Sequence, residues 1–191
     1  MPNQGRKIQI TIDDAPGPSN NEMLALLSQY NIKTMFFVEG EFVAARTTAL
    51  QAIERAGHKL GLHTWDHPLL TKVSADKVRS EFQKTDDIVK KVTGKSMAPN
   101  WRPPYGAFNA QVKTVAQSLG FTKMWLWDVD SLDWKYRSHT DAIIQQVETG
   151  LANTSKTLCD ILFHDKHTSV IALRALLPRL QKNGFQLVNF P

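Results

Sequence analysis

The sequence predicts an α/β protein in which parallel strands alternate with outer helices. Short apolar runs rich in Ile, Val, Leu and Phe recur along the 191 residues, as is typical of strands covered on both faces. Amphipathic segments separate these runs, which indicates strand–helix–strand crossovers. The alternation fits either a closed (β/α) barrel or an open, doubly wound sheet.

Six apolar runs are long enough to predict strands, and a seventh is weaker. The expected strands are residues 7–12, 33–38, 58–62, 121–127, 157–163 and 185–190, with the weaker one near 97–101. Neither a GxGxxG turn nor a GxxxxGK[ST] loop follows any of them. The sequence therefore gives no support to dinucleotide or P-loop binding.

The segments between the strands have helical patterns. The expected helices are residues 19–30, 43–57, 74–94, 110–120, 140–152 and 169–184. Ser19 and Glu22 form a capping-box pattern at the start of the first helix. Gly57 and Gly94 suit the residue after a helix end. Pro178 is expected to kink or split the last helix.

Length and composition predict one globular domain over residues 1–191, which we expect to be monomeric. No run approaches the roughly 20 apolar residues that a membrane span needs, and no signal peptide is visible. We expect a secreted or cell-wall-associated mature domain, although the sequence leaves a cytoplasmic location open. A net charge of +5 suits anionic surfaces, but the scattered basic residues do not predict nucleic-acid binding. The single Cys159 lies in an apolar run and predicts a buried thiol.

Unusual polar residues follow the expected strands rather than precede them. These clusters are Asp13–Asp14, His63–His67, Trp101–Gly106, Asp128–Trp134 and His164–Asp165. In a parallel barrel, the carboxyl ends of all strands share one rim, and active sites lie there. We therefore expect these distant segments to converge.

The two histidines of the second cluster suggest a metal site. His63 and His67 are four residues apart, a spacing that we interpret as one side of a helical turn. With one carboxylate they make a His₂Asp set with an open position, as in catalytic zinc sites, although cobalt and nickel also suit it. The neighbouring aspartate would then accept a proton from an activated water. Alone, each pair is more typical of surface histidines or turn acids.

Further residues at the predicted rim suit acid–base chemistry and substrate binding. His164 suits a general acid because an imidazole titrates near neutral pH. Arg102 suits either a carboxylate clamp or a surface ion pair. Pro103 and Pro104 restrict the loop that presents Tyr105.

Five motifs in this order resemble those of the NodB-homology polysaccharide deacetylases, carbohydrate esterase family 4. The motifs are Thr11–Pro16, His63–His67, Arg102–Gly106, Asp130–Trp134 and Leu162–Asp165. The resemblance covers the whole domain and implies a distorted (β/α) barrel of seven or eight strands. Ile12 and Ala15 stand where the family more often has Phe and Gly. Alanine adopts a positive φ less readily than glycine, so a local change in this loop is expected.

The resemblance implies roles for the aspartates and histidines of the first two motifs and for the arginine of the third. Asp13 would be the catalytic base, and Asp14, His63 and His67 would bind the metal, which we expect to be zinc. Arg102 would orient the base and tune its basicity.

The remaining motifs imply the acid and the substrate groove. The Tyr105 backbone N–H would donate to the oxyanion, and Asp133 would tune His164 as the general acid. The expected substrate-binding residues are Tyr105, Trp134, Leu162 and Pro103, with Leu162 lining the pocket for the acetyl methyl group.

The reaction that the resemblance implies is removal of N-acetyl groups from N-acetylglucosamine units of a glycan. Chitin or chitooligosaccharide is the favoured substrate, and peptidoglycan is next. Three alternatives stay open: an O-acetyl esterase acting on acetylated xylan, a glycan-binding pseudoenzyme, and a barrel that uses metal only for stability.

Overall fold

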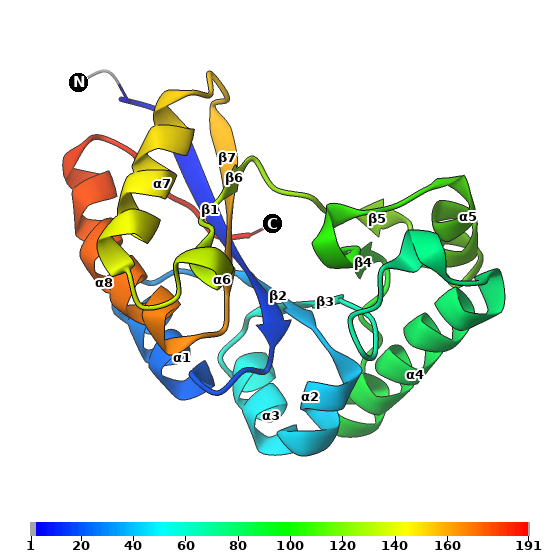
Figure 1. Ribbon diagram of the computed structural model, residues 1–191. Coiled ribbons are helices and arrows are strands. Elements are labelled where there is room, and N and C mark those ends of the chain that lie inside the picture. Colours follow the sequence, from blue (N-terminus) through cyan, green and yellow to red (C-terminus); the bar gives the residue numbers. More distant parts are fainter. Residues whose placement is uncertain (1–2, 191) are drawn as a thin grey trace. The chain divides into compact units, whose positions relative to one another are not determined.

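The computed structural model describes residues 3–190, which divide into two compact units (Figure 1). The first unit contains residues 3–13, 17–35 and 127–190, and the second contains residues 14–16 and 36–126. Within each unit, strands pair in parallel and helices connect them. The predicted α/β class with parallel strands and outer helices is confirmed.

The first unit is built around β1, whose parallel neighbours are β7 and β8; β6 pairs with β7. These strands are β1 (Lys7–Ala15), β6 (Val129–Asp130), β7 (Leu158–His164) and β8 (Gln186–Leu187). Its helices are α1 (Asn20–Gln29), α6 (Asp133–Tyr136), α7 (Thr140–Ala152) and α8 (His167–Lys182). Helix α8 packs against both α1 and α7.

In the second unit, β4 pairs in parallel with both β3 and β5. Its strands are β2 (Met35–Val38), β3 (Lys59–Leu62), β4 (Asn100–Trp101) and β5 (Lys123–Met124). Its helices are α2 (Gly40–Ala45), α3 (Thr47–Arg55), α4 (Ala75–Thr93) and α5 (Ala110–Ser118), with the 3-10 turns η1 (Leu70–Lys72) and η2 (Pro104–Gly106). Helix α4 packs against α2, α3 and α5.

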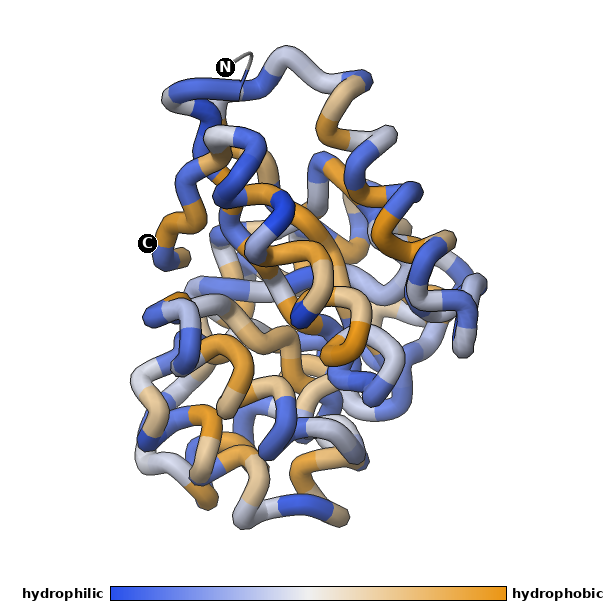
Figure 2. Tube along the Cα trace, turned by 90° about the vertical axis from the view of Figure 1, so that its left-hand side faces the viewer, coloured by the Kyte–Doolittle hydropathy of each residue, from blue (hydrophilic) through white to orange (hydrophobic). Residues whose placement is uncertain are grey.

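Strand alternation divides β1 into an apolar and a polar face. Ile8, Ile10 and Ile12 are buried on one face, since alternate strand residues point the same way. Their register partners on β7 are also apolar: Cys159, Ile161 and Phe163. Cys159 is a buried thiol, as predicted. Along the helices, hydrophobic and hydrophilic residues alternate, as amphipathic packing requires (Figure 2).

Several predicted helices differ from the observed ones. The segment 43–57 forms two helices, α2 and α3, because Arg46 between them leaves helical torsions at φ −137°. Pro178 does not split the last helix, since α8 runs through this residue, and the alternative of a kink stays a prediction. Buried leucines on either side of Pro178 hold the helix in place. The short elements β6 and α6 were not predicted because they are too short for a periodic pattern.

The predicted capping box at Ser19 is wrong, whereas the predicted helix end at Gly94 is confirmed. Ser19 precedes α1, but its side chain makes no capping hydrogen bond. The carboxylate of Glu22 instead pairs with His167 Nδ1 at 2.9 Å and joins α1 to α8. Ser74 caps α4 by accepting the Lys77 N–H, and Gly94 ends α4 at φ 75°.

Within residues 3–190, no helix is both long enough and apolar enough to cross a membrane.

We expect Gly150→Ala to destabilise the first unit. A Cβ on Gly150 of α7 would lie 2.6 Å from Val129 Cγ1 of β6, and valine cannot move away freely. Overpacking costs about 1–3 kcal/mol, against the roughly 1 kcal/mol that alanine gains in helix propensity. Urea denaturation should show a lower free energy of unfolding for the variant.

The control for this prediction is Gln145→Ala, an exposed position of the same helix. It should change the free energy of unfolding by less than about 0.5 kcal/mol. A Gly150→Ala protein as stable as the wild type would contradict the close packing of α7 on β6.

Candidate active site

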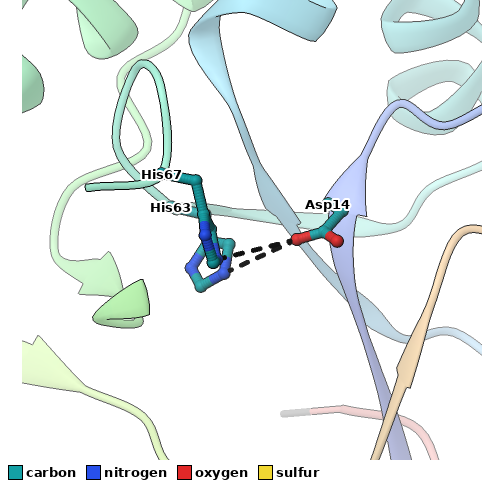
Figure 3. A group of neighbouring side chains, drawn as sticks. All are labelled: Asp14, His63 and His67. Atoms are coloured by element: carbon teal, nitrogen blue, oxygen red, sulfur yellow. Dashed lines mark ion pairs between the residues drawn. The ribbon is translucent and has the colours of Figure 1, made fainter. Parts of the chain in front are cut away.

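Asp14, His63 and His67 bring three potential metal ligands together in the second unit. One ligand atom from each of the three lies within 4.8 Å of the others. His63 Nε2 and His67 Nε2 both lie 3.9 Å from Asp14 Oδ1. Figure 3 shows the two imidazoles and the carboxylate pointing toward one another. The predicted ligand set therefore converges, although its members are up to 53 residues apart in the chain.

The segment from His63 to His67 is an irregular loop after β3, so the expectation of a helical turn is wrong. Thr64 has φ 73° and His67 has φ 54°, torsions that L-residues rarely adopt. These two left-handed residues fold the loop back, and the imidazole rings lie 5.0 Å apart in an edge contact. Two imidazoles meet here because of local backbone strain, not helical spacing.

The backbone of the next strand fixes the orientation of His63. Its Nδ1 lies 2.8 Å from the carbonyl oxygen of Arg102. A carbonyl can only accept, so Nδ1 carries the proton and Nε2 presents its lone pair. This is the usual arrangement of a metal-binding histidine. His63 is also buried, which restricts its rotation.

Asp14 owes its position to an unusual torsion at the end of β1. Its φ is 58°, so the strand alternation breaks at this residue. Ala15 stays in the strand, outside the left-handed region, and is buried. The expected difficulty at Ala15 is therefore wrong, because the residue with positive φ is Asp14.

The three side chains fit a divalent cation. Two ligands on one tetrahedral zinc with bonds of about 2.0–2.2 Å lie roughly 3.3–3.6 Å apart, close to the 3.9 Å that separates Asp14 Oδ1 from each imidazole Nε2. The set combines two imidazole nitrogens with one carboxylate, as in catalytic zinc sites with an open position. The Nδ1 contact of His63 adds the outer-shell partner that such ligands have.

Residues 102–105 form a rigid border beside this set. Arg102 is fully buried, donates to the Leu126 carbonyl at 2.9 Å and stacks over Phe37 at 4.1 Å. Pro103 is buried and precedes η2. Tyr105 has φ 59° and is 65% exposed, and its ring meets the ring of His67 at 4.6 Å. The exposed ring of Tyr105 therefore lies against a candidate metal ligand.

In the first unit, Asp13 and His164 lie side by side. They are register partners at the carboxyl ends of β1 and β7. Paired residues of neighbouring strands project from the same face, and Leu162, two residues earlier, shares the face of His164. Leu162 is buried, whereas Trp134 on α6 is 50% exposed.

Asp133 holds His164 through both carboxylate oxygens. His164 Nδ1 lies 2.6 Å from Oδ1, and the His164 backbone N–H donates to Oδ2 at 2.8 Å. The Ser169 hydroxyl also donates to Oδ2, at 2.5 Å. Burial by itself raises the pKa of Asp133, but the hydrogen bonds and charge of His164 and the bond from Ser169 outweigh it and lower this pKa. Asp133 is thus a buried carboxylate that fixes the proton of His164 on Nδ1.

Sequence reasoning missed two residues that support these groups. Ser169 lies 36 positions after Asp133, and no local pattern connects them. Glu81 is buried on α4 and accepts backbone N–H groups of the His63–His67 loop. The sequence could have indicated Glu81, because this carboxylate lies on the same buried face of α4 as the apolar Val78 and Phe82.

The fold and these residues define a parallel α/β protein with a candidate metal site. A family model described as polysaccharide deacetylase matches residues 1–124, well over half of the chain. The chain belongs to the polysaccharide deacetylase family. The resemblance inferred from the five motifs is thereby confirmed.

Relatives and solved structures agree with this membership. The chain is 35% identical over 185 residues to peptidoglycan-N-acetylglucosamine deacetylase PgdA of Listeria monocytogenes, covering 96% of this chain but 38% of that relative. It thus spans about two fifths of the relative's length. Peptidoglycan deacetylase PdaC from Bacillus subtilis is similar in structure, with a TM-score of 0.83 and 34% identity over 99% of this chain and 89% of that one.

A third similar structure carries a different description. BA3943 from Bacillus anthracis, described as a CE4 family pseudoenzyme, has a TM-score of 0.85 and 26% identity over all of this chain and 65% of that one. These whole-chain similarities confirm the predicted NodB-homology fold class. A single catalytic domain over residues 1–191 stays a prediction.

We expect His63→Ala to abolish tight zinc binding. The variant removes a ligand, so its affinity should fall by at least about 100-fold, more than the 10–100-fold typical for loss of an outer-shell partner. Competition with a chromogenic zinc chelator measures this affinity. His139→Ala, an exposed histidine of the first unit, is the control and should bind zinc like the wild type. Equal zinc binding by both variants would contradict the site.

We also expect Asp133→Asn to destabilise the protein in a pH-dependent way. Removing one partner of a buried charged pair costs about 3 kcal/mol. Because the pKa of Asp133 is lowered in the folded state, its contribution is complete above pH about 4 and is lost as the pH falls through the lowered pKa.

Urea denaturation between pH about 5 and about 2 tests this expectation. The difference in unfolding free energy between wild type and Asp133→Asn should narrow toward low pH. Asp141→Asn, at an exposed position of α7, should show no comparable narrowing. A constant difference across this range would contradict the pairing of Asp133 with His164.

Proposed function

We propose that this protein hydrolyses N-acetyl groups from N-acetylglucosamine units of a glycan with the help of a divalent metal, for which zinc is the expected ion. The observation that carries the proposal is the convergence of Asp14, His63 and His67 within 4.8 Å. Family membership supports the reaction class, and the relative PgdA is named for peptidoglycan N-acetylglucosamine. Chitooligosaccharide and peptidoglycan are both candidate substrates, and we expect action at a cell wall.

Asp14, His63 and His67 would hold the metal. When bound, a zinc ion would supply a Lewis acid for the acetyl carbonyl and lower the pKa of a water molecule. Asp13 takes the proton of the attacking water as general base. The Tyr105 backbone N–H donates to the oxygen that becomes negative in the tetrahedral state.

His164 completes the reaction as general acid. Its Nδ1 proton is held by Asp133, so Nε2 is the atom that delivers a proton to the leaving amine nitrogen. The C–N bond then breaks, giving acetate and a free amino sugar. The Asp133 carboxylate stabilises the charged imidazole, which supports its protonated form before the transfer.

Each unit presents one exposed aromatic side chain that suits sugar binding. Tyr105 and Trp134 present flat rings to solvent, and such rings stack on sugar faces. Leu162 is expected to contact the acetyl methyl group, and Pro103 restrains the loop before Tyr105. Arg102 has few conformations open to it because it is buried and bonded, as a residue that orients a base requires.

The main test is acetate release from N-acetylchitooligosaccharide and from peptidoglycan, with and without a chelator. We expect chelator-sensitive acetate release from at least one of them. Asp13→Asn should lower kcat by about 10²–10⁴-fold, the usual contribution of a general base. Asp141→Asn is the matched control and should keep its activity.

The same assay separates the alternatives. Acetate from acetylxylan alone would support an O-acetyl esterase. Glycan binding without acetate from any substrate would support a pseudoenzyme, as BA3943 is described. Melting on metal removal without any hydrolysis would support a purely structural metal. Each of these results would contradict the proposed N-deacetylase activity.

A further inference from the structure

The loop between the candidate ligands His63 and His67 is strained and depends on outside support. Thr64 and His67 both have positive φ, which costs L-residues free energy. Such a loop keeps one conformation only where its surroundings determine it. The groups that hold its backbone therefore also decide where the His67 imidazole lies.

Two helices of the second unit hold this loop from different directions. At the start of α2, the Gly40 N–H donates to the Thr64 carbonyl at 3.0 Å and the Glu41 N–H donates to the Trp65 carbonyl at 3.1 Å. A Cβ on Gly40 would lie 2.3 Å from Trp65 Cε3, so only glycine permits this approach. These bonds satisfy carbonyl groups and leave the loop's N–H groups to another partner.

Glu81 of α4 is that partner. Its Oε2 accepts the N–H of Trp65 at 2.7 Å and the N–H of Asp66 at 3.2 Å. Glu81 is fully buried, and Lys77, one turn earlier, lies 2.6 Å from Oε1. Lys77 also reaches Asp66 Oδ2 at 3.2 Å. One carboxylate oxygen thus binds two successive amides, while the other is neutralised by a lysine.

We propose that Glu81 is a positioning residue that sets metal affinity by holding the His63–His67 loop in its ligating conformation. This inference rests on the proposed metal-dependent function. Glu81 does not contact a ligand side chain, so it acts only through the backbone of Trp65 and Asp66. Glutamine at this position would keep the size but lose the charge, and its NH₂ group would meet either Lys77 or the loop amides.

The chain contains a matched control in Asp86, five residues further along the same helix. Asp86 is buried, accepts the Met97 N–H at 2.8 Å and pairs with Lys90 at 2.7 Å. Asp86 therefore holds the loop after α4 in the same way that Glu81 holds the His63–His67 loop. Asp86→Asn removes an equivalent buried charge from a loop that carries none of the candidate ligands.

The experiment measures Zn²⁺ affinity of the metal-free wild type, Glu81→Gln and Asp86→Asn by competition with a chromogenic chelator. We expect Glu81→Gln to bind zinc about 10–100-fold more weakly, as loss of outer-shell support does, and Asp86→Asn to bind like the wild type. Equal affinity of Glu81→Gln and wild type, or equal weakening in both variants, would overturn the inference while leaving the proposed function standing. A wild type that binds no zinc would overturn both.

A second measurement needs no variant and covers the case in which Glu81→Gln does not fold. In the metal-free wild type, the Trp65 amide should exchange slowly with deuterium because it donates to a buried carboxylate. The reference amide is Met97, which donates to Asp86. Exchange of Trp65 at the rate of an open loop, with Met97 protected, would overturn the inference.

Discussion

The candidate site depends on one backbone torsion, the left-handed conformation of Asp14. In a regular strand, Asp13 and Asp14 would point to opposite faces. With φ 58° at Asp14, the alternation ends there, while Asp13 keeps its register opposite His164. Asp14 joins His63 and His67 instead. The two adjacent aspartates thereby have different neighbours.

Left-handed backbone conformations also occur in other parts of the candidate site. Thr64, His67 and Tyr105 also have positive φ, and none of them is glycine. Each such residue costs roughly 1–2 kcal/mol, so the folded protein must compensate through neighbouring contacts. The compensation is visible as buried support: the Arg102 carbonyl for His63 and the Glu81 carboxylate for the loop. The strained backbone of the candidate ligands therefore depends on the buried groups that hold it.

The convergence of Asp14, His63 and His67 was predictable from the sequence, but their local geometry was not. Asp14, His63 and His67 could be found because parallel strands bring their carboxyl ends to one edge. This rule of topology applies without knowledge of individual side-chain contacts. The loop conformation at His63–His67, the position of positive φ at Asp14 rather than Ala15, and the break at Arg46 depend on contacts between distant residues. Ser169 illustrates the limit, since its bond to Asp133 spans 36 residues and leaves no periodic trace.

The proposed chemistry is divided between two sets of residues, each with its own supporting contacts. Asp14, His63 and His67 are fixed by a left-handed strand end, the Arg102 carbonyl and α4, whereas His164 is fixed by Asp133 and Ser169. A substitution in one set leaves the supports of the other in place. In this chain both sets retain their ionisable groups and the buried partners that orient them, and such groups are costly to bury without a use. Their joint presence supports the hydrolysis that we propose.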